Sequence, residues 1–378
     1  MKIKAFSYYN KITGWNLEPI NFNDFTLLVG ISGVGKSKIL RAMLDIKSIS
    51  EGKCLNGIKW NIVFETTPEN EYTWEGEFES NPEYENFFDF DDDSNLVTTE
   101  LLYEKLSLNG SEIFFRDRTS CQFQGQATPK LSKTESLIFT LKEENAIEPI
   151  AQGFKRVIFN DQTNSANMFA NSIIGINQLA KKYDSSDKII SSDLNTVLKL
   201  TLVYKNDKEL FQKLKERYCE IFPNVEDIKI EPLGGEHLVL KELPILQIKE
   251  RCVKNWIPLH EISSGMVRTL KLIGQAFLCP QGSVILIDEF ENSLGVNCIN
   301  ILTDEIFHNC CKTQFILTSH HPYIINAISM DSWKLIRRTN SNVSAVDISS
   351  IPNWPKSSHE AFIKLVNLPE FEDGITCE

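Results

Sequence analysis

A glycine-rich loop that ends in lysine and serine lies near the start of the sequence. Residues 27–37 read LLVGISGVGKS, and Gly30, Gly35, Lys36 and Ser37 satisfy the spacing G-x-x-x-x-G-K-[ST]. Backbone N–H groups of such a loop converge on a phosphate, aided by the positive end of the helix that follows. In loops of this type the lysine reaches the β- and γ-phosphates and the serine is a ligand of Mg²⁺. The apolar run before it reads as a buried strand, which is the context that a phosphate-binding loop requires.

Two adjacent carboxylates follow a second apolar run. Residues 284–293 read VILIDEFENS, so Asp288 and Glu289 stand at the carboxyl end of a predicted strand, the edge at which open parallel sheets bind ligands. An acidic pair in this position also serves as a helix N-cap or a solvated turn. Together with the loop, the pair predicts that Asp288 holds Mg²⁺, directly or through water, and that Glu289 accepts a proton from an attacking water.

A third segment, residues 259–274 (LHEISSGMVRTLKLIG), places small polar residues at the start of a predicted helix. Ser263, Ser264 and Gly265 would present hydroxyl and N–H groups at the positive end of that helix, where an anion is favoured. An ordinary N-cap is the alternative. The predicted buried face consists of Met266, Leu270, Ile273 and Phe277.

The elements that must position these residues are visible in the hydrophobic periodicity. Apolar residues alternate over 58–64 and 72–78, which is typical of antiparallel strands, and Asn109-Gly110 is a typical hairpin turn. Residues 166–183 and 206–222 have helical spacing. In the second of these segments Asn206 and Glu209 are placed to form a capping box, and Pro223 ends the helix.

Strands and helices alternate in the last third of the chain. Apolar strands over 283–290 and 314–321 are separated by a helix near 298–307 and followed by a helix after Pro322, and two closing strands are expected in 332–350. Such alternation predicts an α/β fold with a mainly parallel sheet buried on both faces, joined to the antiparallel β portion and a helical insertion.

Composition narrows the class of protein. The net charge of −12 argues against a broad basic face, so nucleic-acid contact would need a local patch or a partner. Nine cysteines without a C-x-x-C pair are not a zinc or disulfide framework. No secretory signal is evident, and no apolar run approaches the roughly 18 residues that cross a bilayer. A cytoplasmic protein without a membrane partner is expected.

The acidic stretch 85–95 predicts a loop, with a metal or basic-partner site as the alternative.

The order of these motifs resembles that of the ABC-type ATPase superfamily, specifically the SMC/RecF/OLD-like AAA proteins. The resemblance spans most of the chain. It equates residues 262–266 with the signature, 284–289 with the Walker B strand, 291–294 with the D-loop, and His320 in LTSHHP with the switch histidine. The ATP-binding loop would comprise Gly30, Ile31, Ser32, Gly33, Val34, Gly35, Lys36, Ser37 and Lys38.

The resemblance implies an ABC-type ATPase head that binds ATP and Mg²⁺ and pairs head to tail with a second copy. Ser263 of one subunit, with Ser264 and Gly265, would cap the γ-phosphate held by Lys36 of the other, and His320, or alternatively His321, would contact that phosphate. One domain over 1–378 is expected, with a phosphate-loop and antiparallel lobe (1–160), a mostly helical insertion (161–258) and a part that carries the remaining motifs (259–378).

The sequence departs from the family pattern at several positions. Ser264 replaces a glycine and Met266 a glutamine in the signature, Lys38 stands where threonine is common, and Ser32 stands where many relatives have asparagine. Candidates for the Q-loop glutamine are Gln122, Gln124 and Gln126, and candidates for the base-stacking residue are Tyr8 and Tyr9.

Three functions follow from these observations. The first is an ATP-hydrolysing switch that controls a separate effector, of the type found in bacterial anti-phage and toxin–antitoxin modules; the effector and the defence role rest on the resemblance. The second is a DNA-repair or DNA-clamping ATPase, which the acidic balance and the lack of a long coiled-coil arm disfavour. The third, a nuclease fused to an ATPase, is disfavoured because only 57 residues follow His321. A transporter subunit is disfavoured by the enlarged helical lobe.

Overall fold

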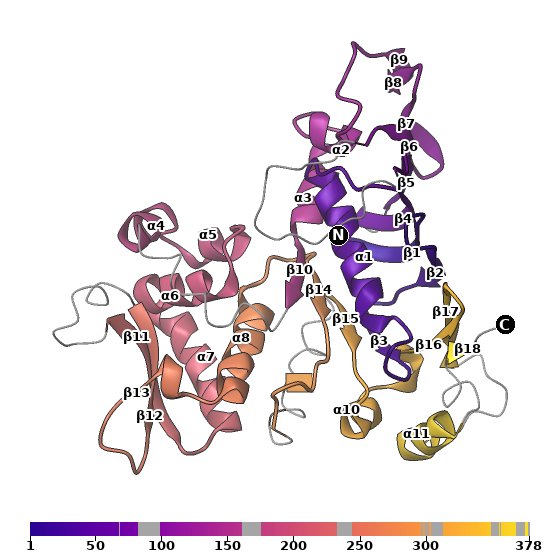
Figure 1. Ribbon diagram of the computed structural model, residues 1–378. Helices are drawn as coiled ribbons and strands as arrows, with labels where there is room; N and C mark the ends of the chain where they lie inside the picture. The colour runs from indigo at the N-terminus through magenta and orange to yellow at the C-terminus, as the bar shows by residue number, and fades with distance from the viewer. Residues whose placement is uncertain are drawn as a thin grey trace. The chain divides into compact units, whose positions relative to one another are not determined.

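The computed structural model describes residues 1–67, 69–81, 99–160, 175–232, 244–295, 298, 302–303, 313–348, 355, 357–367 and 375–376. The chain forms two compact units (Figure 1). Unit 1 comprises residues 1–160, 282–289 and 314–378, and unit 2 comprises residues 161–281 and 290–313. The chain therefore passes from unit 1 into unit 2 between Glu289 and Phe290. The expected single domain with lobes over 1–160, 161–258 and 259–378 stays a prediction.

Unit 1 is built on one large mixed sheet with helices packed against it. Its strands are β1 (Lys2–Asn10), β2 (Trp15–Asn21), β3 (Phe25–Val29), β4 (Ile58–Thr67), β5 (Asn70–Phe78), β6 (Leu101–Leu108), β7 (Ser111–Asp117), β8 (Cys121–Phe123), β9 (Gln126–Ala127), β10 (Val157–Asn160), β14 (Val284–Ile287), β15 (Gln314–Thr318), β16 (Trp333–Thr339), β17 (Asn342–Asp347) and β18 (Ile375–Thr376). Its helices are α1 (Lys36–Ser50), α2 (Leu137–Thr140), α3 (Glu148–Lys155), α10 (Pro322–Ala327) and α11 (Ser358–Val366), with a short 3₁₀ turn at Met330–Ser332.

The part of this sheet that begins at the edge strand β10 is parallel. The strand order is β10-β14-β15-β3-β16, and each neighbouring pair is parallel. Every residue of β3, β14 and β15 is buried, as expected for strands covered on both faces. Because the carboxyl ends of parallel strands meet at one edge, the residues that follow β3, β14 and β15 converge there. The predicted α/β fold with a mainly parallel sheet is confirmed.

The other part of the sheet is mostly antiparallel and continues the order as β17-β2-β1-β4-β5-β6-β7-β8-β9. The alternating segments predicted as strands form the antiparallel pair β4 and β5. Asn109 and Gly110 join β6 to β7 with positive φ angles of 49° and 81°, the conformation that a two-residue hairpin turn needs. The two closing strands expected late in the chain are β16 and β17, which also pair antiparallel.

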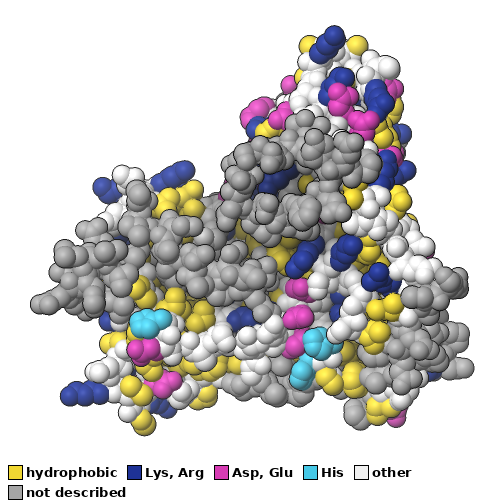
Figure 2. All heavy atoms as spheres, viewed as in Figure 1, with side chains coloured by type: hydrophobic (Ala, Val, Ile, Leu, Met, Phe, Trp, Pro, Cys, Tyr) yellow, Lys and Arg dark blue, Asp and Glu magenta, His cyan; other side chains and the backbone are white. Residues whose placement is uncertain are grey.

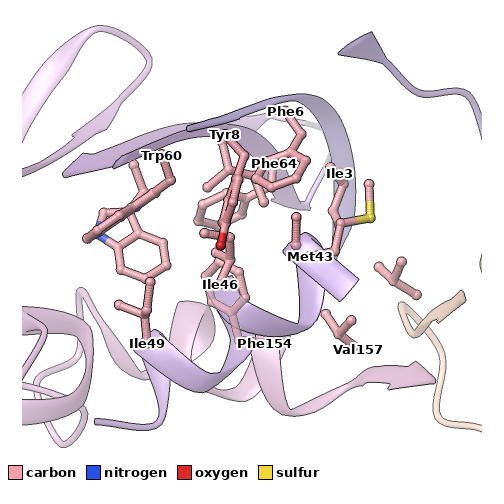
Figure 3. Close-up of a cluster of buried hydrophobic side chains, with 14 of the residues drawn as sticks. Ile3, Phe6, Tyr8, Met43, Ile46, Ile49, Trp60, Phe64, Phe154 and Val157 are labelled. Carbon is pink, nitrogen blue, oxygen red and sulfur yellow. The ribbon is translucent and has the colours of Figure 1, made fainter. Parts of the chain in front are cut away.

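Helix α1 packs against the sheet through a continuous apolar face. Its buried residues include Ile39, Leu40, Met43, Ile46 and Ile49, spaced by three or four positions as an amphipathic helix requires. Figure 3 shows Met43 and Ile46 pointing toward Phe6, Tyr8 and Phe64. Phe154 of α3 packs edge-on against both Phe64 and Trp74, with ring centroids 5.2 Å apart in each pair. This core fixes the start of α1, and with it the end of the glycine-rich loop.

Unit 2 combines helices with a small antiparallel sheet in the order β11-β12-β13. Its elements are α4 (Ile176–Lys182), α5 (Ser186–Ser191), α6 (Thr196–Asn206), α7 (Lys208–Ile221), β11 (Val225–Pro232), β12 (Pro244–Glu250), β13 (Ile257–Pro258), a 3₁₀ turn (Leu259–Glu261) and α8 (Ser264–Leu278).

Two local predictions in unit 2 are corrected. The N-cap of α7 is Asp207, whose carboxylate accepts the backbone N–H of Leu210, whereas the Asn206 amide donates to two backbone carbonyls of other residues. In α8, Leu270 and Ile273 are buried as expected, but Met266 and Phe277 are only partly buried. Leu272, Ala276 and Leu278 are buried instead, because α6 and α7 cover more of this helix than a single apolar stripe implies.

Some predictions fall outside the described residues: the acidic stretch 85–95, residues 166–174 of the first helical segment and most of the helix near 298–307. Among the residues that are described, none of the helices has the length and apolar character needed to cross a membrane.

Candidate nucleotide site

The glycine-rich loop connects β3 to α1 and has the backbone conformations that glycine permits. Gly30 has φ 151°, and a Cβ atom there would lie 2.9 Å from the carbonyl oxygen of Ile336. Gly35 is the N-cap of α1 with φ 109°, in the left-handed region. The first turn of α1 contains no acidic residue. Its N–H groups therefore form a site at which an anion is favoured.

Lys36 lies inside the curve of this loop. Its side chain is buried, and Nζ donates hydrogen bonds to the carbonyl oxygens of Gly30 at 2.7 Å and Ile31 at 2.9 Å. These bonds hold a positive charge beside the loop N–H groups. Since the ammonium group has three protons, it can bridge a loop carbonyl and a phosphate oxygen. The loop geometry is thus suited to the polyphosphate that the sequence pattern predicts.

The loop serine and the first strand-end carboxylate meet directly. Ser37 Oγ donates to Asp288 Oδ1 at 2.9 Å, although the two residues are 251 positions apart in the chain. The register of β14 and β15 with β3 brings them together at the carboxyl edge of the parallel sheet. A hydroxyl and a carboxylate side by side are the hard oxygen ligands that Mg²⁺ prefers. This is the juxtaposition that the sequence predicts for these two residues.

Thr318 is a member of this cluster that the sequence reasoning missed. Its Oγ1 donates to Asp288 Oδ1 at 2.6 Å and accepts the backbone N–H of Glu289 at 2.8 Å. The signal was present as the threonine in LTSHHP, but only the pairing of β14 with β15 places it beside the carboxylates. Glu289 itself has φ 44°, which non-glycine residues rarely adopt, and it is exposed.

The two histidines follow β15. His320 is exposed at the end of that strand. The carbonyl oxygen of His321 accepts the N–H groups of Ile324 and Ile325 in the first turn of α10. The backbone N–H of His321 donates to Ser319 Oγ at 3.1 Å. Both histidines follow the end of β15, and which of them is the switch histidine stays a prediction. In Figure 2, acidic and histidine side chains gather near the middle of the viewed face, with Lys and Arg side chains beside them.

The signature residues lie in unit 2 at the start of α8. Ser263 is the N-cap, and its Oγ accepts the N–H of Met266 at 3.3 Å. Ser263 and Ser264 are exposed. Gly265 cannot be replaced without movement, since a Cβ there would lie 2.2 Å from the carbonyl oxygen of Ser293. The segment predicted as the D-loop (291–294) thus packs directly on the signature glycine.

The candidates for the Q-loop and for base stacking have unequal support. Gln122, Gln124 and Gln126 lie in or between β8 and β9, at the opposite end of the strand order from the loop, so none can reach it (Figure 1). Tyr8 is buried, and its hydroxyl donates to Asp45 Oδ2 at 2.7 Å, which removes it from base stacking. Tyr9 is exposed.

Two cations flank the loop in unit 1. Lys38 Nζ lies 4.8 Å from the ring centroid of Trp15, and burial, with a contribution from Arg338, lowers its pKa. Arg338 Nη1 donates to the carbonyl oxygen of Gly33 at 3.4 Å. Lys38 therefore lies next to the loop, as predicted. Among the described residues, no group of three or more His, Cys, Asp and Glu side chains is arranged to hold a metal.

Comparisons with known proteins agree with this fold. The chain matches, over residues 25–326, the model of the family described as "AAA domain, putative AbiEii toxin, Type IV TA system". No curated protein matches it. A crystal structure of an SMC head bound to the C-terminal winged-helix domain of ScpA is similar, with TM-score 0.54, 15% identity and coverage of 92% of this chain and 97% of that one. An SMC head domain from Pyrococcus furiosus with an extended coiled coil, bound to the C-terminal domain of ScpA, is also similar, with TM-score 0.52, 13% identity and coverage of 91% and 96%.

Proposed function

Because this chain belongs to that family of AAA domains, we propose that it is an ATP-binding and ATP-hydrolysing switch protein, which dimerises around ATP and regulates a separate effector. The observation that carries the proposal is the hydrogen bond between Ser37 and Asp288, which joins the phosphate loop to the acidic strand end. A glycine-rich loop, a buried lysine and this pair support a site for a nucleotide with Mg²⁺, and the position of Glu289 directly after Asp288 supports hydrolysis there.

Each residue has a defined part in the proposal. Lys36 and the loop N–H groups bind the β- and γ-phosphates. Ser37 and Asp288 would hold Mg²⁺, which would neutralise charge on the phosphates. Glu289 accepts a proton from the water that attacks the γ-phosphate, and His320 donates a hydrogen bond to that phosphate.

Dimerisation would complete the site in trans. Ser263, Ser264 and the N–H groups at the start of α8 are available to a second copy, because both serine side chains are exposed. In the proposed sandwich they cap the γ-phosphate bound by Lys36 of the other copy, and hydrolysis then opens the dimer. Both similar SMC heads were solved bound to a domain of ScpA, which is a precedent for a head of this fold with a partner protein. Membership in a family described by a toxin–antitoxin system supports a role in bacterial anti-phage defence, which we place in the cytoplasm.

Glu289→Gln tests the proposal because it removes the base and keeps the shape of the side chain. ATP binding should persist, and hydrolysis should slow by a factor on the order of 100 to 10,000. Light scattering of this variant with ATP and Mg²⁺ should show a dimer, and without ATP a monomer. Equal ATPase rates for the variant and the wild type would remove Glu289 from the mechanism, and a monomer under every condition would remove the sandwich.

A DNA-clamping ATPase of the SMC/RecF type is the second candidate, and the observation that favours it is the similarity to SMC heads. It predicts that duplex DNA stimulates the ATPase and that the stimulation falls steeply with salt. If DNA neither binds nor stimulates, this candidate is wrong, and the effector-switch proposal is the one to pursue through proteins that co-purify with and without ATP.

A further inference from the structure

Thr318 connects the two carboxylate residues of the site. Its side chain is buried at the end of β15, and its single hydroxyl group makes two bonds of opposite type. It donates to Asp288 Oδ1 at 2.6 Å and accepts from the backbone N–H of Glu289 at 2.8 Å. Since a hydroxyl has only one proton, the bond to the carboxylate fixes its direction and leaves a lone pair for the N–H group.

The two bonds restrain the Asp288 carboxylate and the backbone of Glu289. Asp288 Oδ1 also accepts from Ser37, so Thr318 and Ser37 together fix the rotation of this carboxylate about its side-chain bond. The backbone of Glu289 is in the left-handed region at φ 44°, and the hydroxyl holds its N–H in that conformation. The direction in which the Glu289 side chain leaves the strand depends on this conformation.

We propose that Thr318 is a positioning residue for ATP hydrolysis: it orients Asp288 toward Mg²⁺ and holds the backbone that aims Glu289 at the attacking water. This inference rests on the proposed ATPase function, which it deepens. In this proposal Thr318 acts through Asp288 and Glu289 and not by contact with the nucleotide. Loss of its hydroxyl should therefore affect the Mg²⁺ requirement and turnover, and should spare the binding of the phosphates to Lys36 and the loop.

The test compares Thr318→Val, which keeps the shape and removes the hydroxyl, with Thr318→Ser, which keeps the hydroxyl. Outer-sphere partners of metal ligands typically contribute 10- to 100-fold, so kcat of Thr318→Val should fall by about that factor. The MgCl2 concentration for half-maximal rate should rise, while the Kd for ATP measured in EDTA should stay the same. Thr318→Ser should retain most of the wild-type rate and Mg²⁺ dependence.

Thr26→Val is a matched control, because Thr26 is a buried threonine of the adjacent strand β3 whose hydroxyl bonds only to Asn23 among the contacts described. It should lower the melting temperature without changing the Mg²⁺ dependence. If Thr318→Val does not fold, Thr318→Ala, which also lacks the hydroxyl, decides the question.

The outcomes separate the two proposals. If the wild type is active and Thr318→Val has the same kcat and the same Mg²⁺ dependence, the inference is wrong and the proposed function stands. Equal losses in Thr318→Val and Thr318→Ser also overturn it, because the hydroxyl would then not be the cause. A wild-type chain that binds no ATP overturns the proposed function and this inference together.

Discussion

Asp45 gives a quantitative prediction about the helix that begins at the phosphate loop. It lies on α1, eight residues after Ser37, and its Oδ2 accepts the Tyr8 hydroxyl at 2.7 Å. Burial raises the pKa of Asp45 from 3.8 to about 6, and the bond from Tyr8 offsets only part of this rise. The folded chain therefore binds a proton at Asp45 more tightly than the unfolded chain does.

The size and direction of the effect follow from this shift. A rise of about 2 pKa units corresponds to about 3 kcal/mol, at 1.36 kcal/mol per unit. The ionised carboxylate costs stability fully above about pH 6, and the cost disappears as the pH falls below about 4, where both states are protonated. Asp45→Asn keeps an oxygen acceptor for Tyr8 and removes the charge. It should raise the free energy of unfolding at pH 7.5, and about 3 kcal/mol is the upper bound of this gain. The actual gain should be smaller, because the carboxylate is partly exposed and solvent screens its charge.

Urea unfolding at a series of pH values from 4 to 8 measures this effect. The gain for Asp45→Asn should be largest at pH 7.5 and should shrink toward pH 4. Glu143→Gln is the control, since it removes a charge from an exposed carboxylate and should have little effect on stability at any pH. A variant that is less stable than the wild type at pH 7.5, or a gain that does not change with pH, would refute the reasoning.

Three further predictions concern the site and the core. Lys36→Ala should abolish ATP binding, because the phosphates lose their main cation, and calorimetric titration with ATP measures this; wild-type affinity in the variant would exclude Lys36 from the site. Ser263→Arg should leave ATP binding by the monomer intact and prevent the ATP-dependent dimer of the Glu289→Gln background, which light scattering detects; a dimer of normal size would place the signature outside the interface. Phe154→Ala should lower the free energy of unfolding by about 3–5 kcal/mol, since it empties the space against Phe64 and Trp74; urea unfolding measures the loss, and a loss below about 1 kcal/mol would mean that the core closes around the gap.

Local sequence patterns predict the parts of the site that are local in the chain. The loop from Gly30 to Ser37 and the strand ending at Asp288 are each recognisable alone, because glycine conformation and an apolar run leave direct traces in the sequence. Their contact through Ser37 could be predicted because parallel strands share an edge. The hairpin at Asn109-Gly110 is predictable for the same local reason.

Other features depend on which elements become neighbours, and the sequence does not show this. Thr318 could not be assigned because its role exists only once β15 lies beside β14. Tyr8 resembled a base-stacking residue until Asp45 of α1 was found opposite its hydroxyl. Asn206 and Asp207 are both residue types that cap helices well. The Asn206 amide donates to the carbonyl oxygens of Ala180 and Tyr183, and Asp207 is therefore the residue that caps α7.

The passage of the chain out of unit 1 directly after Glu289 has a mechanical consequence. Phe290 already belongs to unit 2, so the residue proposed to activate water is joined to the helical unit by a single peptide bond, with a rarely used backbone angle on one side of it. A protein that binds the helical unit and displaces Phe290 would therefore also displace Glu289 through the main chain, without contact with the nucleotide.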